Sequence, residues 1–135
     1  MVVLRPGALG DALLTLPVLH ALRAAGARRI TVLGSPGSWA FLSEDAARSG
    51  LSVRDLGAPE WLGLFADGAR LGWSARELLA QAALGLVYLA PDAKFMVNAL
   101  KRAGVKKVLC VDPPRLGERY EAGASVCHAA HRLLD

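Results

Sequence analysis

The sequence predicts an α/β protein with a Rossmann-like, doubly wound parallel sheet, and three observations support this prediction. Five short segments that favour strands recur along the chain, and segments that favour helices separate them. A glycine-bearing turn follows the first of these strand segments and leads directly into a long apolar helix. The chain has 135 residues, of which 53% are hydrophobic, which is enough for one domain with a substantial core. Because strands alternate with helices, we expect the strand order 3-2-1-4-5 with helices on both faces.

The N-terminal segment predicts a strand, a tight turn and a helix. Val2–Leu4 is apolar and rich in β-branched residues, which is typical of a buried strand. The following loop, residues 5–10, contains the breakers Gly7 and Gly10. Asp11 then stands at the expected N-cap of the helix, directly before a long apolar segment.

The first helix contains one unusual residue, Pro17. Because proline has no N–H and its ring clashes with the preceding turn, we expect it to bend or break the helix. Thr15 stands just before it and offers a hydroxyl that could hydrogen-bond a freed carbonyl.

The middle of the chain predicts two further strands and two short helical segments. Residues 30–33 form a short apolar run, and residues 52–56 favour a third strand; turn residues follow both segments. A short helix follows the second strand, and residues 60–65 favour a single helical turn after the third. The apolar residues expected on the inner sides of these two segments are Trp39, Phe41, Leu42, Ala46, Trp61, Leu64 and Phe65.

The C-terminal half predicts the remaining strands and helices. Ser74 and Glu77 have the spacing of a capping box, so they open a helix that extends to about Ala83. The fourth and fifth strands are expected at residues 86–89 and 107–111. The other expected elements are a helix at 93–103 capped by Asp92 and ended by Gly104, a loop at 112–123 and a helix at 125–134.

Two interpretations of Asp11 are open at this point. Aspartate is a favoured N-cap, so its carboxylate could simply satisfy helix N–H groups. It also follows the carboxyl end of a strand, where open α/β sheets bind ligands, so it could act as a general base or orient a ligand. Backbone N–H groups of the turn and of the first helical turn favour an anion in the same place.

The sequence around Asp11 resembles the start of the family 9 glycosyltransferases, which include the bacterial lipopolysaccharide heptosyltransferases. Members of that family begin with a strand ending in Arg or Lys, a turn of small residues, Gly-Asp, an apolar pair and Thr-Leu-Pro. The corresponding residues here are Arg5, Gly7-Ala8, Gly10-Asp11, Leu13-Leu14 and Thr15-Leu16-Pro17. Residues 86–111 are similar to a later strand, helix and strand of the family, and residues 126–135 resemble the helix that closes its first domain.

This resemblance implies a GT-B fold, in which the active site lies between two Rossmann-like domains. Residues 1–135 would form a single acceptor-side domain, and the domain that holds most of the nucleotide diphosphate sugar would be absent from this chain. The implied reaction moves a sugar with inversion, without a metal or another cofactor, to a lipopolysaccharide-type saccharide. Asp11 is the implied catalytic base, and the implied substrate contacts in its turn are Arg5, Gly7, Ala8 and Gly10.

The formal net charge of +4 suits an anionic partner, such as a phosphorylated glycolipid, a membrane surface or a nucleic acid, and selects none of them. Arg115 and Arg119 follow the fifth predicted strand on the cleft side, where they could contact a phosphate. Together with the resemblance, this charge predicts a phosphorylated saccharide or glycolipid acceptor, peripheral contact with the inner membrane surface, and no nucleic acid.

Other functions find less support in the sequence. Gly7 and Gly10 alone do not make the three-glycine dinucleotide fingerprint, and the chain has no Walker A lysine motif. Cys110 is expected in a buried strand and in reduced form. The histidines and cysteines lack the spacing of a metal or redox site: His20, His128, His131, Cys110 and Cys127. Because neither a membrane span nor a signal peptide is recognisable, we expect a cytoplasmic protein.

A second function class also stays open. The chain could be a small, non-catalytic α/β binding domain that retains the fold alone. In either case we expect residues 1–135 to be inactive by themselves, because a cleft between two domains needs both halves.

Overall fold

The computed structural model of the protein describes residues 1–42, 48–66, 69–88 and 94–111. Five parallel strands form one sheet in the order β3-β2-β1-β4-β5, which confirms the predicted order. The strands are β1 (Val2–Leu4), β2 (Ile30–Gly34), β3 (Leu51–Asp55), β4 (Leu84–Val87) and β5 (Lys107–Cys110). β1 is central, and its Val3 pairs with Val32 of β2 on one side and with Leu86 of β4 on the other.

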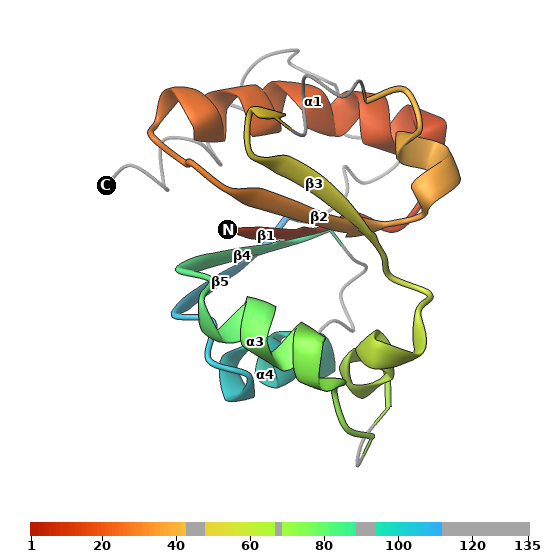
Figure 1. Ribbon diagram of the computed structural model, residues 1–135, viewed down its shortest axis with the longest axis vertical. Coiled ribbons are helices and arrows are strands. Elements are labelled where there is room, and N and C mark those ends of the chain that lie inside the picture. Colours follow the sequence, from red (N-terminus) through yellow and green to blue (C-terminus); the bar gives the residue numbers. More distant parts are fainter. Residues whose placement is uncertain (43–47, 67–68, 89–93, 112–135) are drawn as a thin grey trace, which may run out of the picture.

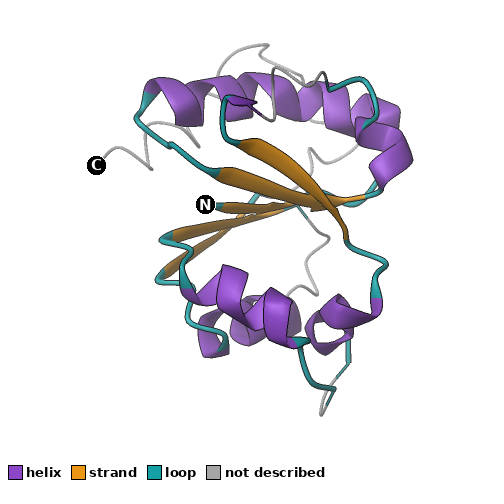
Figure 2. Cartoon of the chain, in the orientation of Figure 1, coloured by secondary structure: helices purple, strands orange, loops and turns teal. Residues whose placement is uncertain are grey.

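Helices cover both faces of the sheet, as the alternating pattern predicts (Figures 1 and 2). The helices are α1 (Leu9–Ala24), α3 (Trp73–Ala80) and α4 (Lys94–Arg102), with the 3₁₀ helices η1 (Pro36–Trp39) and η2 (Pro59–Leu64). α1 lies on one face, and α3, α4 and η2 lie on the other. The described helices include none that is long and apolar enough to cross a membrane.

Each face of the sheet has its own apolar core. Under α1, the side chains of Val3 and Val32 pack with Leu19 of the helix. On the opposite face, Leu4 packs with Leu79 of α3 and with other buried residues of α4 and η2. Successive side chains of a strand point to opposite faces, so the central strands must be apolar throughout to fill both cores. A fully buried leucine or valine contributes roughly 1.5–3 kcal/mol relative to an exposed one.

The N-terminal half of α1 differs from the prediction in two ways. The N-cap is Ala8, and Asp11 is the third residue of the helix, so the prediction that Asp11 is the N-cap was wrong. Pro17 does not break the helix, which continues to Ala24. Both Pro17 and Leu13, whose carbonyl loses its usual donor, are exposed, so water can reach the freed oxygen. The Thr15 hydroxyl bonds the carbonyl of Asp11 instead, at 2.8 Å.

The start of α3 also differs from the prediction. The helix begins at Trp73 after Gly72, and the Ser74 hydroxyl donates to the Glu60 carboxylate and not to a helix N–H. The Gly72 N–H donates to the Glu60 carbonyl at 2.8 Å, so η2 fixes the entry into α3. A capping box depends on local spacing alone, and here a contact with a distant residue replaces it.

Smaller differences concern boundaries and burial. The third and fourth strands begin one and two residues earlier than predicted, at Leu51 and Leu84. Trp61 and Leu64 are buried as expected, whereas Phe65 is exposed. Cys110 is exposed because it ends β5, which is an edge strand, so its predicted burial was wrong. The predictions for Ala46, Asp92, Cys127 and the helix at 125–134 lie outside the described residues.

Candidate functional site

The candidate site lies at the carboxyl end of β1, where the strand order changes direction. Arg5 follows β1 and Tyr88 follows β4. The Arg5 N–H donates to the Leu33 carbonyl at 2.9 Å, and the Tyr88 N–H donates to the Leu4 carbonyl at 3.0 Å. Both residues are therefore held in place by the sheet itself. A crevice at such a switch point is where open α/β sheets bind ligands.

Asp11 stands in the first turn of α1, which follows the carboxyl end of β1. Its Oδ2 accepts the Ala8 N–H at 3.2 Å, which is the carboxylate half of a capping box. Ala8 has no side-chain acceptor, so the reciprocal half is missing. The Asp11 side chain is 44% exposed, so it is partly accessible to solvent. Negative charge is also favoured at the N-terminus of a helix.

Arg5 fixes the other oxygen of this carboxylate. Its Nη2 donates to Asp11 Oδ1 at 2.9 Å, and its Nε donates to the Thr15 hydroxyl at 3.0 Å. The guanidinium carbon lies 4.8 Å from the centre of the Tyr88 ring, which is the distance of a cation–π contact. The Arg5 side chain is only 16% exposed. It is therefore committed to partners inside the protein, and its geometry fits positioning of Asp11 better than the predicted substrate contact.

The turn between β1 and α1 needs glycine at one of its two predicted positions. Gly7 has φ +130°, and a Cβ added there would come within 2.9 Å of Asp11 Cγ. The Gly7 carbonyl accepts the Ser38 hydroxyl at 2.9 Å, which ties the turn to η1. At Gly10 a Cβ would meet nothing within 4 Å, so space does not require glycine there. Gly7 thus shapes the site, and Gly10 does so to a lesser degree.

A hollow of about 400 Å³ lies beside this turn, at the carboxyl ends of β2 and β3. Its lining residues are Pro6, Gly7, Gly34, Ser35, Asp55, Leu56, Gly57, Leu62 and Phe65. Leu62 and Phe65 are half exposed, at 55% and 51%. Asp55 Oδ1 accepts the Gly57 N–H at 2.9 Å. The hollow therefore combines apolar walls with a carboxylate at its edge, and it shares Gly7 with the Asp11 turn.

Burial raises the pKa of the Tyr88 phenol above its ordinary value, and the Arg5 charge offsets part of this rise. The phenol is therefore neutral at physiological pH and can donate as well as accept a hydrogen bond. Tyr88, Ser38 and Asp55 were not singled out from the sequence. Tyr88 and Asp55 follow or end strands at the carboxyl edge, so their position was a usable signal.

The structure does not test the two other predicted site residues. Arg115 and Arg119 lie outside the described residues. His20 is an exposed residue of α1. Among residues 1–42, 48–66, 69–88 and 94–111, no group of three or more His, Cys, Asp and Glu could hold a metal ion.

The arrangement can accept a proton at a fixed, accessible carboxylate beside a hollow of small-ligand size. A comparison with known proteins adds no further assignment, since no protein-family model, curated protein or solved structure matches this chain. The chemistry of the site must therefore be argued from its own geometry.

Proposed function

We propose that this chain is the acceptor-binding domain of an inverting, metal-independent glycosyltransferase of the heptosyltransferase type. The observation that carries the proposal is the Asp11 carboxylate, which is 44% exposed and fixed at the carboxyl edge of the sheet. The resemblance of the β1–α1 segment to family 9 glycosyltransferases supplies the reaction class. The acceptor is a phosphorylated saccharide or glycolipid of the lipopolysaccharide type.

In this mechanism Asp11 is the catalytic base. Arg5 and the Ala8 N–H each occupy one lone pair of a carboxylate oxygen, so each oxygen keeps another for the acceptor. An acceptor hydroxyl would donate its proton to Asp11 while its oxygen bonds the anomeric carbon of the donor sugar. The anomeric carbon–oxygen bond to the diphosphate breaks at the same time, and the nucleotide diphosphate leaves with the electron pair. Attack opposite to the leaving group inverts the anomeric carbon.

The donor is a nucleotide diphosphate sugar, which we assign mainly to a second domain outside these residues. The hollow beside Gly7 is open to solvent on the side of the carboxyl edge and has the size of a sugar-binding site. A cytoplasmic location with peripheral contact with the inner membrane surface would bring the domain to a lipid-linked acceptor.

A non-catalytic binding domain is the alternative, and one observation favours it. Both oxygens of Asp11 already accept hydrogen bonds from Arg5 and Ala8, as they would if the carboxylate only stabilised the turn. Under this alternative the carboxyl edge would bind a saccharide without transferring it.

Turnover assays separate the two functions. Residues 1–135 are assayed alone and joined to the donor domain of a family 9 glycosyltransferase, with a nucleotide diphosphate sugar and a phosphorylated core glycolipid. We expect no turnover by residues 1–135 and measurable turnover by the two-domain protein. Turnover by residues 1–135 alone would contradict the division of the site between two domains. A two-domain protein that binds both substrates and does not react would support the non-catalytic alternative.

A further inference from the structure

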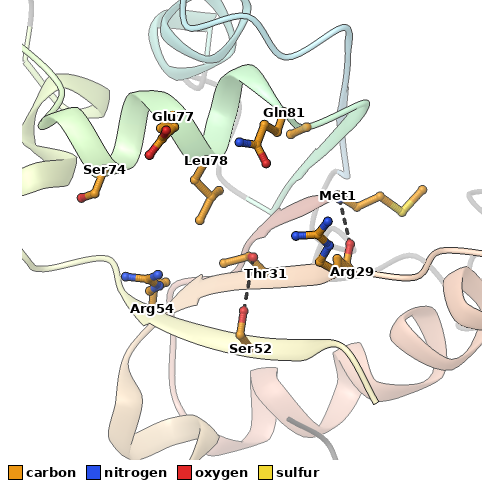
Figure 3. Close-up of a pocket in the computed structure, with 10 residues that line it drawn as sticks. Met1, Arg29, Thr31, Ser52, Arg54, Ser74, Glu77, Leu78 and Gln81 are labelled. Carbon is orange, nitrogen blue, oxygen red and sulfur yellow. Dashed lines mark hydrogen bonds between the residues drawn. The ribbon is translucent and has the colours of Figure 1, made fainter. Parts of the chain in front are cut away.

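A second hollow lies on the opposite side of the sheet from α1, between α3 and the strands β2 and β3 (Figure 3). We call it the polar groove. It has a volume of about 460 Å³ and is lined by Met1, Arg29, Thr31, Ser52, Arg54, Ser74, Glu77, Leu78, Gln81 and Ala82. This volume is in the range of small-molecule sites. None of its lining residues belongs to the Asp11 turn or to the hollow beside Gly7.

One wall of the polar groove is a part of the sheet that no apolar element covers among the described residues. On this face, Leu33 of β2 is buried in the core under α3 and η2. Its neighbours on the same face are polar, since Thr31 pairs with Ser52 and Leu33 pairs with Arg54 in the parallel register. Ser52 and Arg54 are exposed. A parallel sheet that is covered on both faces has apolar residues at such positions. The polar residues on this part of β2 and β3 therefore favour contact with water or with a polar ligand.

The other wall is a polar stripe of α3. Figure 3 shows Glu77, Leu78 and Gln81 facing the strands across the groove, with Ser74 further along the same helix. Positions separated by three or four residues share one side of a helix, and Glu77 and Gln81 have this spacing. The neighbouring side of α3 carries Ala75 and Leu79, which are fully buried in the core. The helix thus packs with one side and leaves its polar side over the groove.

The charged groups of the two walls do not neutralise one another. Within the described part of the chain, the side chains of Arg29, Arg54 and Glu77 have no hydrogen-bond or ion-pair partner. The hydroxyls of Thr31 and Ser52 lie 3.3 Å apart on the strand wall. No hydrogen bond joins the strand wall to the α3 wall among these lining residues. Two guanidinium groups, the N-terminal ammonium group of Met1 and the Glu77 carboxylate therefore line this concave space.

We propose that the polar groove binds a phosphate monoester of a hydroxylated small molecule, as in a sugar phosphate. Arg29 and Arg54 together match the two negative charges of a phosphate dianion, and guanidinium groups bind phosphate through paired N–H donors. Glu77 accepts hydrogen bonds from ligand hydroxyls, and the amide of Gln81 can donate or accept. A plain carboxylate ligand would leave one of the two guanidinium charges unmatched.

This site is independent of the proposed catalytic base. Arg29 and Thr31 stand at the beginning of β2, whereas Asp11 follows the end of β1. Arg54 stands one residue before the end of β3 and lines the groove together with residues of α3. Asp11 belongs to α1, which covers the other face of the sheet. A ligand in the polar groove would not contact the Asp11 carboxylate.

Binding is measured on residues 1–135 by NMR titration with glucose 6-phosphate, inorganic phosphate and glucose. We expect saturable shifts at the groove residues with both phosphate probes at millimolar concentration, and none with glucose. Arg54→Gln should weaken binding of both phosphate probes by about tenfold or more, because it removes charge-assisted hydrogen bonds. Arg76→Gln is the matched control: it also removes one guanidinium charge, from α3, but Arg76 does not line the groove.

Glu77→Gln tests the assignment of the two ends of the ligand. It removes a negative charge beside the phosphate site and a strong acceptor for sugar hydroxyls. We therefore expect inorganic phosphate to bind more tightly, while the preference for glucose 6-phosphate over inorganic phosphate becomes smaller. Asp11→Asn should leave the shifts at the groove residues unchanged, so this result is separable from any failure of the glycosyltransferase proposal. Absence of saturable binding by both phosphate probes, equal effects of Arg54→Gln and Arg76→Gln, or saturable shifts that occur only outside the groove would overturn the proposal.

Discussion

We compare the site around Asp11 at the carboxyl edge of the sheet, called the carboxyl-edge site, with the polar groove. Both contain arginine and a carboxylate, but within the part of the chain that the structure describes these groups are paired with each other only in the first. At the carboxyl edge, Arg5 and Asp11 form an ion pair at 2.9 Å, and Arg5 also donates to Thr15. In the polar groove, Arg54 and Glu77 have no such partner among the described residues. The first site is thus arranged before any ligand arrives, whereas the second leaves its charges to be matched by a ligand.

This difference separates stability from binding. A residue of the carboxyl edge contributes to folding as well as to function, because its loss leaves a neighbouring polar group without a partner. The side chains of Arg29, Arg54 and Glu77 in the polar groove have no partner to lose among the described residues, so their substitution should affect binding and leave folding nearly unchanged. Matched substitutions at the two sites therefore test the comparison.

The largest effect is expected for Gly7→Ala. An alanine at this position would have to adopt the unfavourable φ of +130°, and its Cβ would collide with the Asp11 carboxylate. We expect the free energy of unfolding to fall by about 2–4 kcal/mol in urea denaturation. The control Gly10→Ala lies in the first turn of α1 with open space around it, so it should stabilise the protein by up to about 1 kcal/mol. Equal destabilisation by both substitutions would contradict the claim that glycine is required at position 7 because of its contact with the Asp11 carboxylate.

A pair of Thr→Val substitutions comes next. Thr15 is 1% exposed, and its hydroxyl accepts from Arg5 Nε and donates to the Asp11 carbonyl. Thr15→Val should lower the free energy of unfolding by about 1–2 kcal/mol. Thr31→Val removes only an exposed contact with Ser52 and should change it by less than about 0.5 kcal/mol. Chemical denaturation of both variants checks this, and a reversed order would refute the comparison.

A smaller effect is expected for Arg5→Lys. Lysine keeps the charge beside Asp11 but loses the Nε bond to Thr15 and the planar contact with Tyr88. We expect a loss of about 1 kcal/mol in the free energy of unfolding, which is modest because the Asp11 side is partly exposed to solvent. Arg54→Lys should leave stability within about 0.5 kcal/mol of the unchanged protein. If Arg54→Lys proved the more destabilising of the two, Arg54 would have an internal partner after all.

The smallest effect concerns the pH dependence of stability. Burial raises the pKa of Tyr88, so the folded state favours the neutral phenol. A tyrosine in the unfolded chain ionises at about pH 10, and Tyr88 in the folded protein ionises at a higher pH. The free energy of unfolding should therefore be unaffected by Tyr88 below that pH and should decrease as the pH rises above it. Tyr88→Phe should remove this decrease, as measured by urea denaturation between neutral and alkaline pH.

Much of the fold follows from the sequence, because buried parallel strands have short apolar runs that are visible without a structure. Val2–Leu4 and the turn at Gly7 placed the carboxyl edge correctly. The partners of Arg5 could not be predicted, because Thr15 and Tyr88 reach it only when α1 and β4 are set against β1. The polar groove was equally hidden. Arg54 is an ordinary polar residue in an alternating strand until the position of α3 shows what faces it.

The measurement that tests the central claim most directly is turnover by the two-domain protein carrying Asp11→Asn. Asparagine can still accept a hydrogen bond from Ala8 or Arg5, so the free energy of unfolding should fall by no more than about 1 kcal/mol. General base catalysis typically contributes about 10²–10⁴-fold, so we predict a loss of that size in kcat with little change in acceptor binding. Undiminished kcat in the Asp11→Asn protein would contradict the account and would leave Asp11 with only its role in stabilising the first turn of α1.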